Sequence, residues 1–106
     1  MYTFLDKSKS SVTLRPEGTV GAVRAILNAG LQYTLPHKVY YSGSMFRYER
    51  PQRGRYREFT QFGIEFMGSN AYSCDVECIT VAMDMITQLK ISNPSLKINS
   101  LGDLER

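Results

Sequence analysis

The side chains best suited to chemistry are five arginines gathered within eleven residues around one acid, Glu49. They are Arg47, Arg50, Arg53, Arg55 and Arg57. A guanidinium donates its hydrogen bonds in a planar fork, which holds phosphate oxygens in a fixed orientation and stabilises charge that develops during phosphoryl or adenylyl transfer. Because Tyr48 and Tyr56 are interleaved, two other interpretations stay open: a solvated loop, or a surface that contacts nucleic-acid phosphates and stacks on bases.

A second group of polar side chains follows in residues 58–67. In a β-strand, alternation would give this segment an apolar core face made of Phe62, Ile64 and Phe66. The opposite face would carry an aromatic ring, an amide, a glycine and a carboxylate: Phe59, Gln61, Gly63 and Glu65. These groups suit an adenine, a polar substrate and an ammonium, and the glycine indicates a close approach to the backbone. Polar residues also line the solvent side of ordinary half-buried strands, so a purely structural role stays open.

The surrounding pattern predicts the elements that position these residues. The arginines would lie on a loop, residues 49–55, between antiparallel strands at 38–48 and 58–67. The other predicted elements are a hairpin of residues 2–5 and 11–14, a helix over Thr19–Ala29 stopped by Gly30, a helix capped by Asp75 and ending near Leu89, and a final strand at 96–99. The order β-β-α-β-β-α-β predicts an α+β fold, an antiparallel β-sheet with flanking helices.

Composition limits the class of protein further. The 106 residues carry 13 basic and 10 acidic side chains, a net charge of +3. Residues 47–57 contribute five positive charges and one negative, or +4, so the rest of the chain carries −1 and is not generally basic. Mean hydropathy is −0.28 and no apolar run approaches bilayer length, so no membrane partner is expected. Cys74, Cys78 and His37 are too few for a structural zinc site, and the thiols are interpreted as small, partly buried side chains.

Three strings resemble the catalytic domain of histidyl-tRNA synthetase: LRPEGT, MFRYERPQRGRYREFTQFGIE and INSLGD, in this order and spacing. The middle string resembles the family's version of class II aminoacyl-tRNA synthetase motif 2, which is an arginine-bearing strand, a loop and a returning strand. The resemblance extends nearly end to end. It implies that residues 1–106 are part of a class II catalytic core.

The resemblance also implies an activity and a set of site residues. Histidine and ATP would give histidyl-adenylate, and the histidyl group would then pass to the 3′ end of tRNA(His). Arg47 on the α-phosphate and Arg55 on the terminal phosphates would be catalytic. ATP would be bound by these two together with Glu49 and Phe59, the latter stacked on adenine, and Mg²⁺ would be bound through the ATP phosphates. The histidine pocket would be lined by Glu17, Thr19, Gln61 and Glu65.

One position departs from the family pattern, and several motifs are not found. Thr60 stands where the family usually has histidine, on the opposite strand face from the pocket residues. The chain lacks motif 3, the histidine-specific motif, the anticodon-binding domain and most of motif 1. We therefore expect a partial catalytic domain that is inactive or nearly so alone, from a homodimeric parent in the cytoplasm or an organelle. Open sheet edges and apolar patches predict that the chain self-associates.

Two alternatives remain. A synthetase-like regulatory subunit of ATP phosphoribosyltransferase would share the fold but need not keep the motif 2 arginines. The presence of Arg47, Glu49, Arg55 and Phe59 favours the enzyme. A pure RNA-binding module would use the arginine loop, but its basic excess is confined to eleven residues beside a carboxylate pocket. The choice of histidine over another amino acid rests on the resemblance alone.

Overall fold

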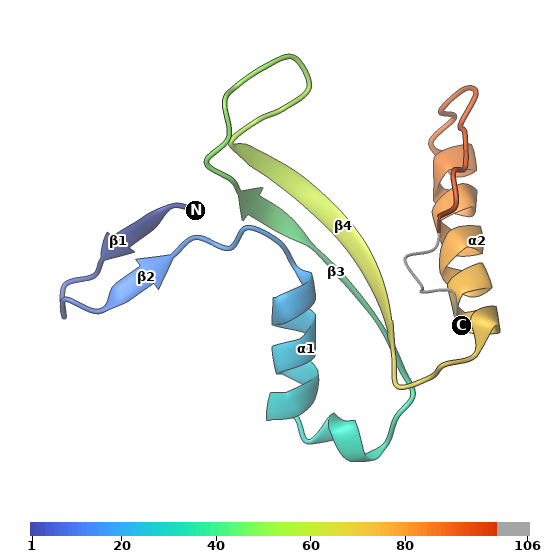
Figure 1. Cartoon of the computed structure of the whole chain (residues 1–106), viewed down its shortest axis with the longest axis horizontal. Coiled ribbons are helices and arrows are strands. Elements are labelled where there is room, and N and C mark those ends of the chain that lie inside the picture. Colours follow the sequence, from blue (N-terminus) through green and yellow to red (C-terminus); the bar gives the residue numbers. More distant parts are fainter. Residues whose placement is uncertain (100–106) are drawn as a thin grey trace.

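A computed structural model describes residues 1–99 of the chain (Figure 1). Two hairpins and two helices make up its regular structure, together with one short 3₁₀ turn. In chain order the elements are β1 (Thr3–Leu5), β2 (Ser11–Thr13), α1 (Thr19–Asn28), η1 (Leu31–Tyr33), β3 (His37–Phe46), β4 (Glu58–Met67) and α2 (Tyr72–Gln88). Each hairpin is a separate two-stranded antiparallel sheet. The predicted α+β class, with antiparallel strands and flanking helices, is confirmed.

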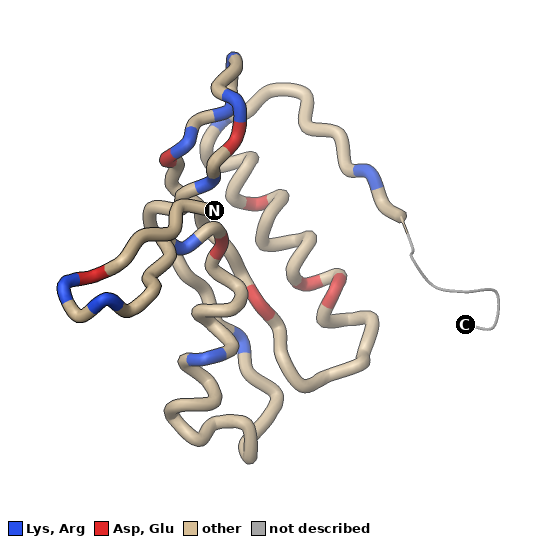
Figure 2. Tube along the Cα trace, turned by 60° about the vertical axis from the view of Figure 1, so that its left-hand side comes forward, with Lys and Arg blue, Asp and Glu red and all other residues tan. Residues whose placement is uncertain are grey.

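The β3–β4 hairpin is the framework of the molecule. Its ten-residue strands pair along their whole length, with Tyr41 opposite Gly63 and Met45 opposite Phe59. β4 has the predicted bounds, whereas β3 ends two residues before the predicted strand. The loop that joins the strands projects beyond the rest of the fold (Figure 1) and carries a concentration of basic residues (Figure 2). The long hairpin thus holds the arginines at one end.

The two helices cover opposite faces of this hairpin (Figure 1). α1 lies on the face of Tyr41 and ends as predicted, because Gly30 adopts a left-handed conformation with φ of 69° just beyond its C-cap. α2 lies on the other face, where Lys38 and Glu77 form an ion pair of 2.7 Å. Phe62 was expected in a core face but is 46% exposed. The reason is that α2 covers the hairpin near Ile64, further along β4.

Two predicted features at the C-terminal side were wrong. α2 begins at Tyr72, so Asp75 lies in its first turn instead of capping it, where its charge still favours the positive end of the helix dipole. Residues 96–99 form no strand. A strand requires a neighbour for its backbone groups, and the ladders of residues 1–99 join only β1 with β2 and β3 with β4. The last part of the INSLGD string lies outside the described residues.

The hydrophobic core is small for a chain of this length. Its buried apolar side chains within residues 1–99 are Ile26, Met45 and Cys74. The accessible surface is 9366 Å², against about 6,000 Å² for a compact monomer of this mass. The radius of gyration is 17.3 Å, against about 13 Å for a compact domain. The fold is therefore open, and many large apolar side chains remain exposed. No helix in residues 1–99 is long and apolar enough to cross a bilayer.

Candidate active site

The start of α1 and the middle of β4 meet at a hydrogen bond. The Thr19 hydroxyl donates to Glu65 Oε1 at 2.6 Å, which joins residues 46 positions apart. Gln61 lies on the same strand face as Gly63 and Glu65, two and four positions before them. Its buried Oε1 has no hydrogen-bond partner within residues 1–99. A buried amide oxygen is costly to leave unpaired, so this oxygen is suited to accept a hydrogen bond from a ligand. The predicted histidine-pocket residues Thr19, Gln61 and Glu65 therefore lie on one surface.

Glu17 lies next to Thr19, at the N-terminus of α1. The N-cap residue of α1 is Gly18, which has no side chain to accept hydrogen bonds from the first turn. Glu17 does this instead, accepting from the backbone N–H of Thr19 at 2.6 Å and of Val20 at 3.2 Å. The Val20 amide is the main cause that lowers the pKa of the Glu17 carboxyl, and the Thr19 amide and the charge of Arg47 act in the same direction. Glu17 is therefore held as a carboxylate at the helix N-terminus.

Arg47 follows directly after β3 and is fixed at two points. Its Nε donates to the Pro16 carbonyl oxygen at 2.9 Å, and its guanidinium carbon lies 5.0 Å from the centre of the Phe59 ring. The segment before α1 is held close by because the Phe46 N–H donates to the Arg15 carbonyl oxygen at 2.9 Å. Arg47 is thus positioned between the turn that carries Glu17 and the strand face that starts at Phe59.

The other arginines are held less firmly. Arg55 and Glu49 form an ion pair at 3.6 Å, with side chains 64% and 43% exposed. Exposed pairs of this kind contribute little to stability, so the Arg55 side chain can turn toward a ligand. Arg57 contacts other residues of the loop region. Its guanidinium lies 4.9 Å from the Tyr48 ring centre, and its Nε donates to the Glu49 carbonyl at 3.2 Å. Arg50 and Arg53 make no side-chain contact of this kind with residues 1–99.

The sequence indicated a close approach at Gly63, and the structure shows what approaches. A Cβ atom at Gly63 would lie less than 3.0 Å from the Cζ, hydroxyl and Cε2 atoms of Tyr41. A Cβ at Gly18 would overlap the same ring, at Cε2, Cδ2 and Cζ. The group near Gly63 is therefore a tyrosine of the same chain. Sequence reasoning missed Tyr41, although its position opposite Gly63 follows from the hairpin register.

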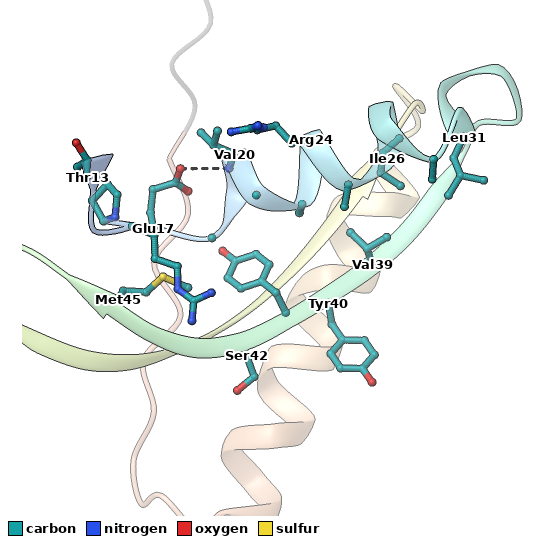
Figure 3. Close-up of a pocket in the computed structure, with 18 of the residues that line it drawn as sticks. Thr13, Glu17, Val20, Arg24, Ile26, Leu31, Val39, Tyr40, Ser42 and Met45 are labelled. Carbon is teal, nitrogen blue, oxygen red and sulfur yellow. Dashed lines mark hydrogen bonds between the residues drawn. The ribbon is translucent and has the colours of Figure 1, made fainter. Parts of the chain in front are cut away.

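A cavity of about 1030 Å³ lies between α1 and β3 (Figure 3). Glu17, Ile26 and Met45 are among the residues that line it, together with Gly18 and Tyr41. Phe59, Gln61 and Glu65 do not line it, so the cavity adjoins the predicted site without coinciding with it. The predicted site residues form an open surface. Within residues 1–99, no group of three or more histidine, cysteine or acidic side chains could hold a metal ion.

The two cysteines contribute nothing to this surface. Both are free, with Cys74 buried and Cys78 half-buried on α2. α2 covers the opposite face of the hairpin (Figure 1). The interpretation of both thiols as small, partly buried side chains is in keeping with these positions.

Comparison with known proteins identifies relatives of this chain. Residues 1–103 match a family model described as histidyl-tRNA synthetase. A histidine–tRNA ligase of Bacillus licheniformis is 55% identical over 107 residues, covering 99% of this chain and 25% of the relative. One of Listeria innocua is 54% identical over 107 residues, with the same coverage. The crystal structure of apo S. aureus histidyl-tRNA synthetase superposes with a TM-score of 0.74 at 40% identity, over 87% of this chain and 25% of that one.

The fold and these matches place the chain among the aminoacyl-tRNA synthetases, with an α+β structure that corresponds to part of a catalytic domain. More particularly, the chain belongs to the histidyl-tRNA synthetase family. It spans about a quarter of the length of the curated relatives it matches.

Proposed function

We propose that this chain forms the motif 2 part of the active site of a histidine–tRNA ligase. The complete protein would activate histidine with ATP and transfer the histidyl group to the 3′ end of tRNA(His). The observation that carries the proposal is the convergence at β4. The Thr19–Glu65 hydrogen bond of 2.6 Å and the unpaired Oε1 of Gln61 lie on the strand face that begins at Phe59, beside Arg47.

Each group has a chemical task in this proposal. The carboxylates of Glu17 and Glu65 suit the ammonium of histidine, and the Thr19 hydroxyl and Gln61 amide supply neutral partners beside them. A planar ring at Phe59 suits adenine, and the Arg47 guanidinium beside that ring would contact the α-phosphate of the same ATP molecule. The two halves of the surface would thus hold the two substrates next to each other.

The reaction needs positioning and charge stabilisation, without a covalent bond to the protein. The histidine carboxylate attacks the α-phosphorus, a new C–O–P linkage forms, and pyrophosphate leaves with the electrons of the broken P–O bond. Arg47 would stabilise charge on the α-phosphate while its Nε hydrogen bond to Pro16 keeps the guanidinium oriented. Arg55 would pair with the terminal phosphates after exchanging its exposed contact with Glu49. Mg²⁺ would enter on the ATP phosphates and neutralise part of their charge.

We propose that the 106 residues alone have little or no activity. The site residues form an open surface beside a cavity that only Glu17 among them lines, and such a surface leaves water in contact with the reacting groups. The complete protein would act as a homodimer in the cytoplasm or an organelle. The exposed apolar side chains support self-association of the chain alone.

The test is histidine-dependent exchange of pyrophosphate into ATP. It should be measured on a protein of the length of the relatives that contains these residues, with the 106-residue chain in parallel. We expect exchange by the longer protein and none by the chain. If a folded longer protein binds histidine without exchange, the regulatory-subunit alternative replaces the proposal.

Arg47→Ala and Arg53→Ala form a matched pair for the RNA-binding alternative. A nucleotide site loses ATP affinity with the first substitution only. An RNA surface would instead lose affinity in both variants, with a reduced dependence on salt.

A further inference from the structure

We propose that Tyr41 is a positioning residue that sets the spacing between the two halves of the amino-acid site. The inference rests on the proposed function, because it concerns the residues assigned there to histidine. No chemical step is assigned to Tyr41. Its ring is a spacer between the turn before α1 and the strand β4.

The argument begins with the order of residues on the two sides of the ring. Gly18 lies between Glu17 and Thr19, and Gly63 lies between Gln61 and Glu65 on the strand face. Both glycines therefore stand in the middle of a pair of site residues. Because Tyr41 is directly opposite Gly63 in the hairpin register, its ring meets the backbone at the centre of each pair.

The ring is the reason that both positions are glycine. A Cβ at either position would lie less than 3.0 Å from Tyr41 ring atoms, a distance that real side chains essentially never show. The backbone itself does not require glycine: Gly18 has φ of −101°, and Gly63 lies within a regular strand. Glycine at both sites lets the ring come against the backbone, and this contact fixes how closely the turn approaches β4.

The contact at Gly18 is made by ring carbons, and at Gly63 the hydroxyl oxygen lies beside two ring carbons. The Tyr41 hydroxyl makes no hydrogen bond with any residue of 1–99, whereas its Cε2 and Cζ atoms lie against both glycines. A phenylalanine would keep the spacer, and an alanine would remove it. Without the ring, hydrogen bonds would still hold the turn against the hairpin, through Thr19 and Glu65, Arg47 and Pro16, and Arg15 with Ser44 and Phe46, but nothing would fill the space between the two glycines.

Tyr41 also lines the cavity of about 1030 Å³ beside α1. The ring therefore has free space next to it. A methyl group introduced at Gly63 can push the ring toward the cavity without breaking the β3–β4 ladder. The expected consequence is a change in the site geometry with the hairpin retained.

The experiment is a double-mutant cycle in a protein of the relatives' length, read by histidine-dependent pyrophosphate exchange. The variants are Tyr41→Ala, Gly63→Ala and the two combined, with Tyr41→Phe as the conservative replacement. Gly21→Ala is the matched glycine control, because a Cβ at Gly21 would meet no atom of the described residues within 4 Å. The KM values for histidine and for ATP are measured separately, together with the melting temperature.

We expect Tyr41→Ala and Gly63→Ala each to raise the KM for histidine about tenfold or more, with the KM for ATP within about twofold, since small displacements of positioning groups have effects of this size. Tyr41→Phe and Gly21→Ala should stay within about twofold of wild type. Gly63→Ala should have almost no added effect on top of Tyr41→Ala, because residues that share one contact are not additive.

Three results would overturn the inference. They are additive effects of the two substitutions, equal rises in both KM values accompanied by a lower melting temperature, and failure of Tyr41→Phe to keep activity. If Tyr41→Ala does not fold, Gly18→Ala and Gly63→Ala test the inference instead, since both place a methyl group against the Tyr41 ring. Both variants must then raise the KM for histidine, and an unchanged KM in either one overturns the inference. A wild-type protein without exchange refutes the proposed function itself, and this inference with it.

Discussion

Arg47→Lys keeps the positive charge of the arginine assigned to the α-phosphate and removes its geometry. The Nε of Arg47 donates to the Pro16 carbonyl at 2.9 Å while the guanidinium lies over Phe59, 5.0 Å from the ring centre. Lysine has no donor at the position of Nε, and its charge is a point at the end of a flexible stem. The substitution therefore separates the contribution of charge from the contribution of orientation.

The expected loss follows from the hydrogen bond that disappears. Hydrogen bonds of charged groups contribute about 1.5–3 kcal/mol, and Arg47 is exposed, which favours the lower end of that range. A loss of about 1.5 kcal/mol corresponds to roughly tenfold. An arginine can also donate two parallel hydrogen bonds to one phosphate, and the loss of one of them in the lysine variant adds to the tenfold effect. We expect kcat/KM for ATP in pyrophosphate exchange to fall at least about tenfold.

The matched control is Arg53→Lys, in the same loop, because the Arg53 side chain makes no hydrogen bond, ion pair or ring contact with residues 1–99. It should retain wild-type kinetics. Arg47→Lys with more than half of the wild-type kcat/KM would refute the reasoning, since charge alone would then be sufficient. An equal loss in both variants would also refute it, because the effect would belong to the loop as a whole.

Three further predictions concern single groups. Thr19→Val removes the hydroxyl that donates to Glu65 at 2.6 Å and should raise the KM for histidine in pyrophosphate exchange, whereas Thr19→Ser should not; equal KM values in both variants would contradict the role of the hydroxyl. Met45 is 3% exposed, so Met45→Ala should lower the free energy of unfolding by about 2–5 kcal/mol in urea denaturation; a loss below 1 kcal/mol would contradict the assigned core. Because the pKa of Glu17 is lowered from 4.5, its stabilising contribution is present above pH 4.5 and is lost as pH falls through the folded pKa. Glu17→Gln should therefore reduce the rise of the free energy of unfolding with pH in this acidic range. An unchanged dependence of that free energy on pH would refute the prediction.

The hairpin and the first helix could be predicted because their signals are local. Alternation in residues 58–67 gave the bounds of β4, and Gly30 marked the end of α1. The final strand at 96–99 could not be judged in this way, because a strand depends on a partner that the sequence does not specify. The start of α2 was placed at Asp75 because a good capping residue and a first-turn acid have the same appearance in a sequence.

In the candidate site, too, residues on one strand could be grouped from the sequence, whereas contacts between distant segments could not. The shared face of Phe59, Gln61 and Glu65 follows from the two-residue period of a strand. The contact of Thr19 with Glu65 bridges 46 residues and is a property of the packing of α1 on the hairpin. Glycine at Gly63 signalled that a group lies close by, but only the register identifies that group as Tyr41.

The hydrogen bond between Thr19 and Glu65 makes ligand binding at this surface an exchange reaction. The Glu65 carboxylate already has a donor, and the Glu17 carboxylate already accepts two backbone amides. A ligand that offers only a neutral hydroxyl would replace one bond with an equivalent one and gain little. An ammonium replaces a neutral donor with a charged one, and charge-assisted bonds are roughly twice as strong. If the proposed function holds, the surface would therefore discriminate by charge, and it would favour amino acids over their deaminated analogues before any side chain is recognised.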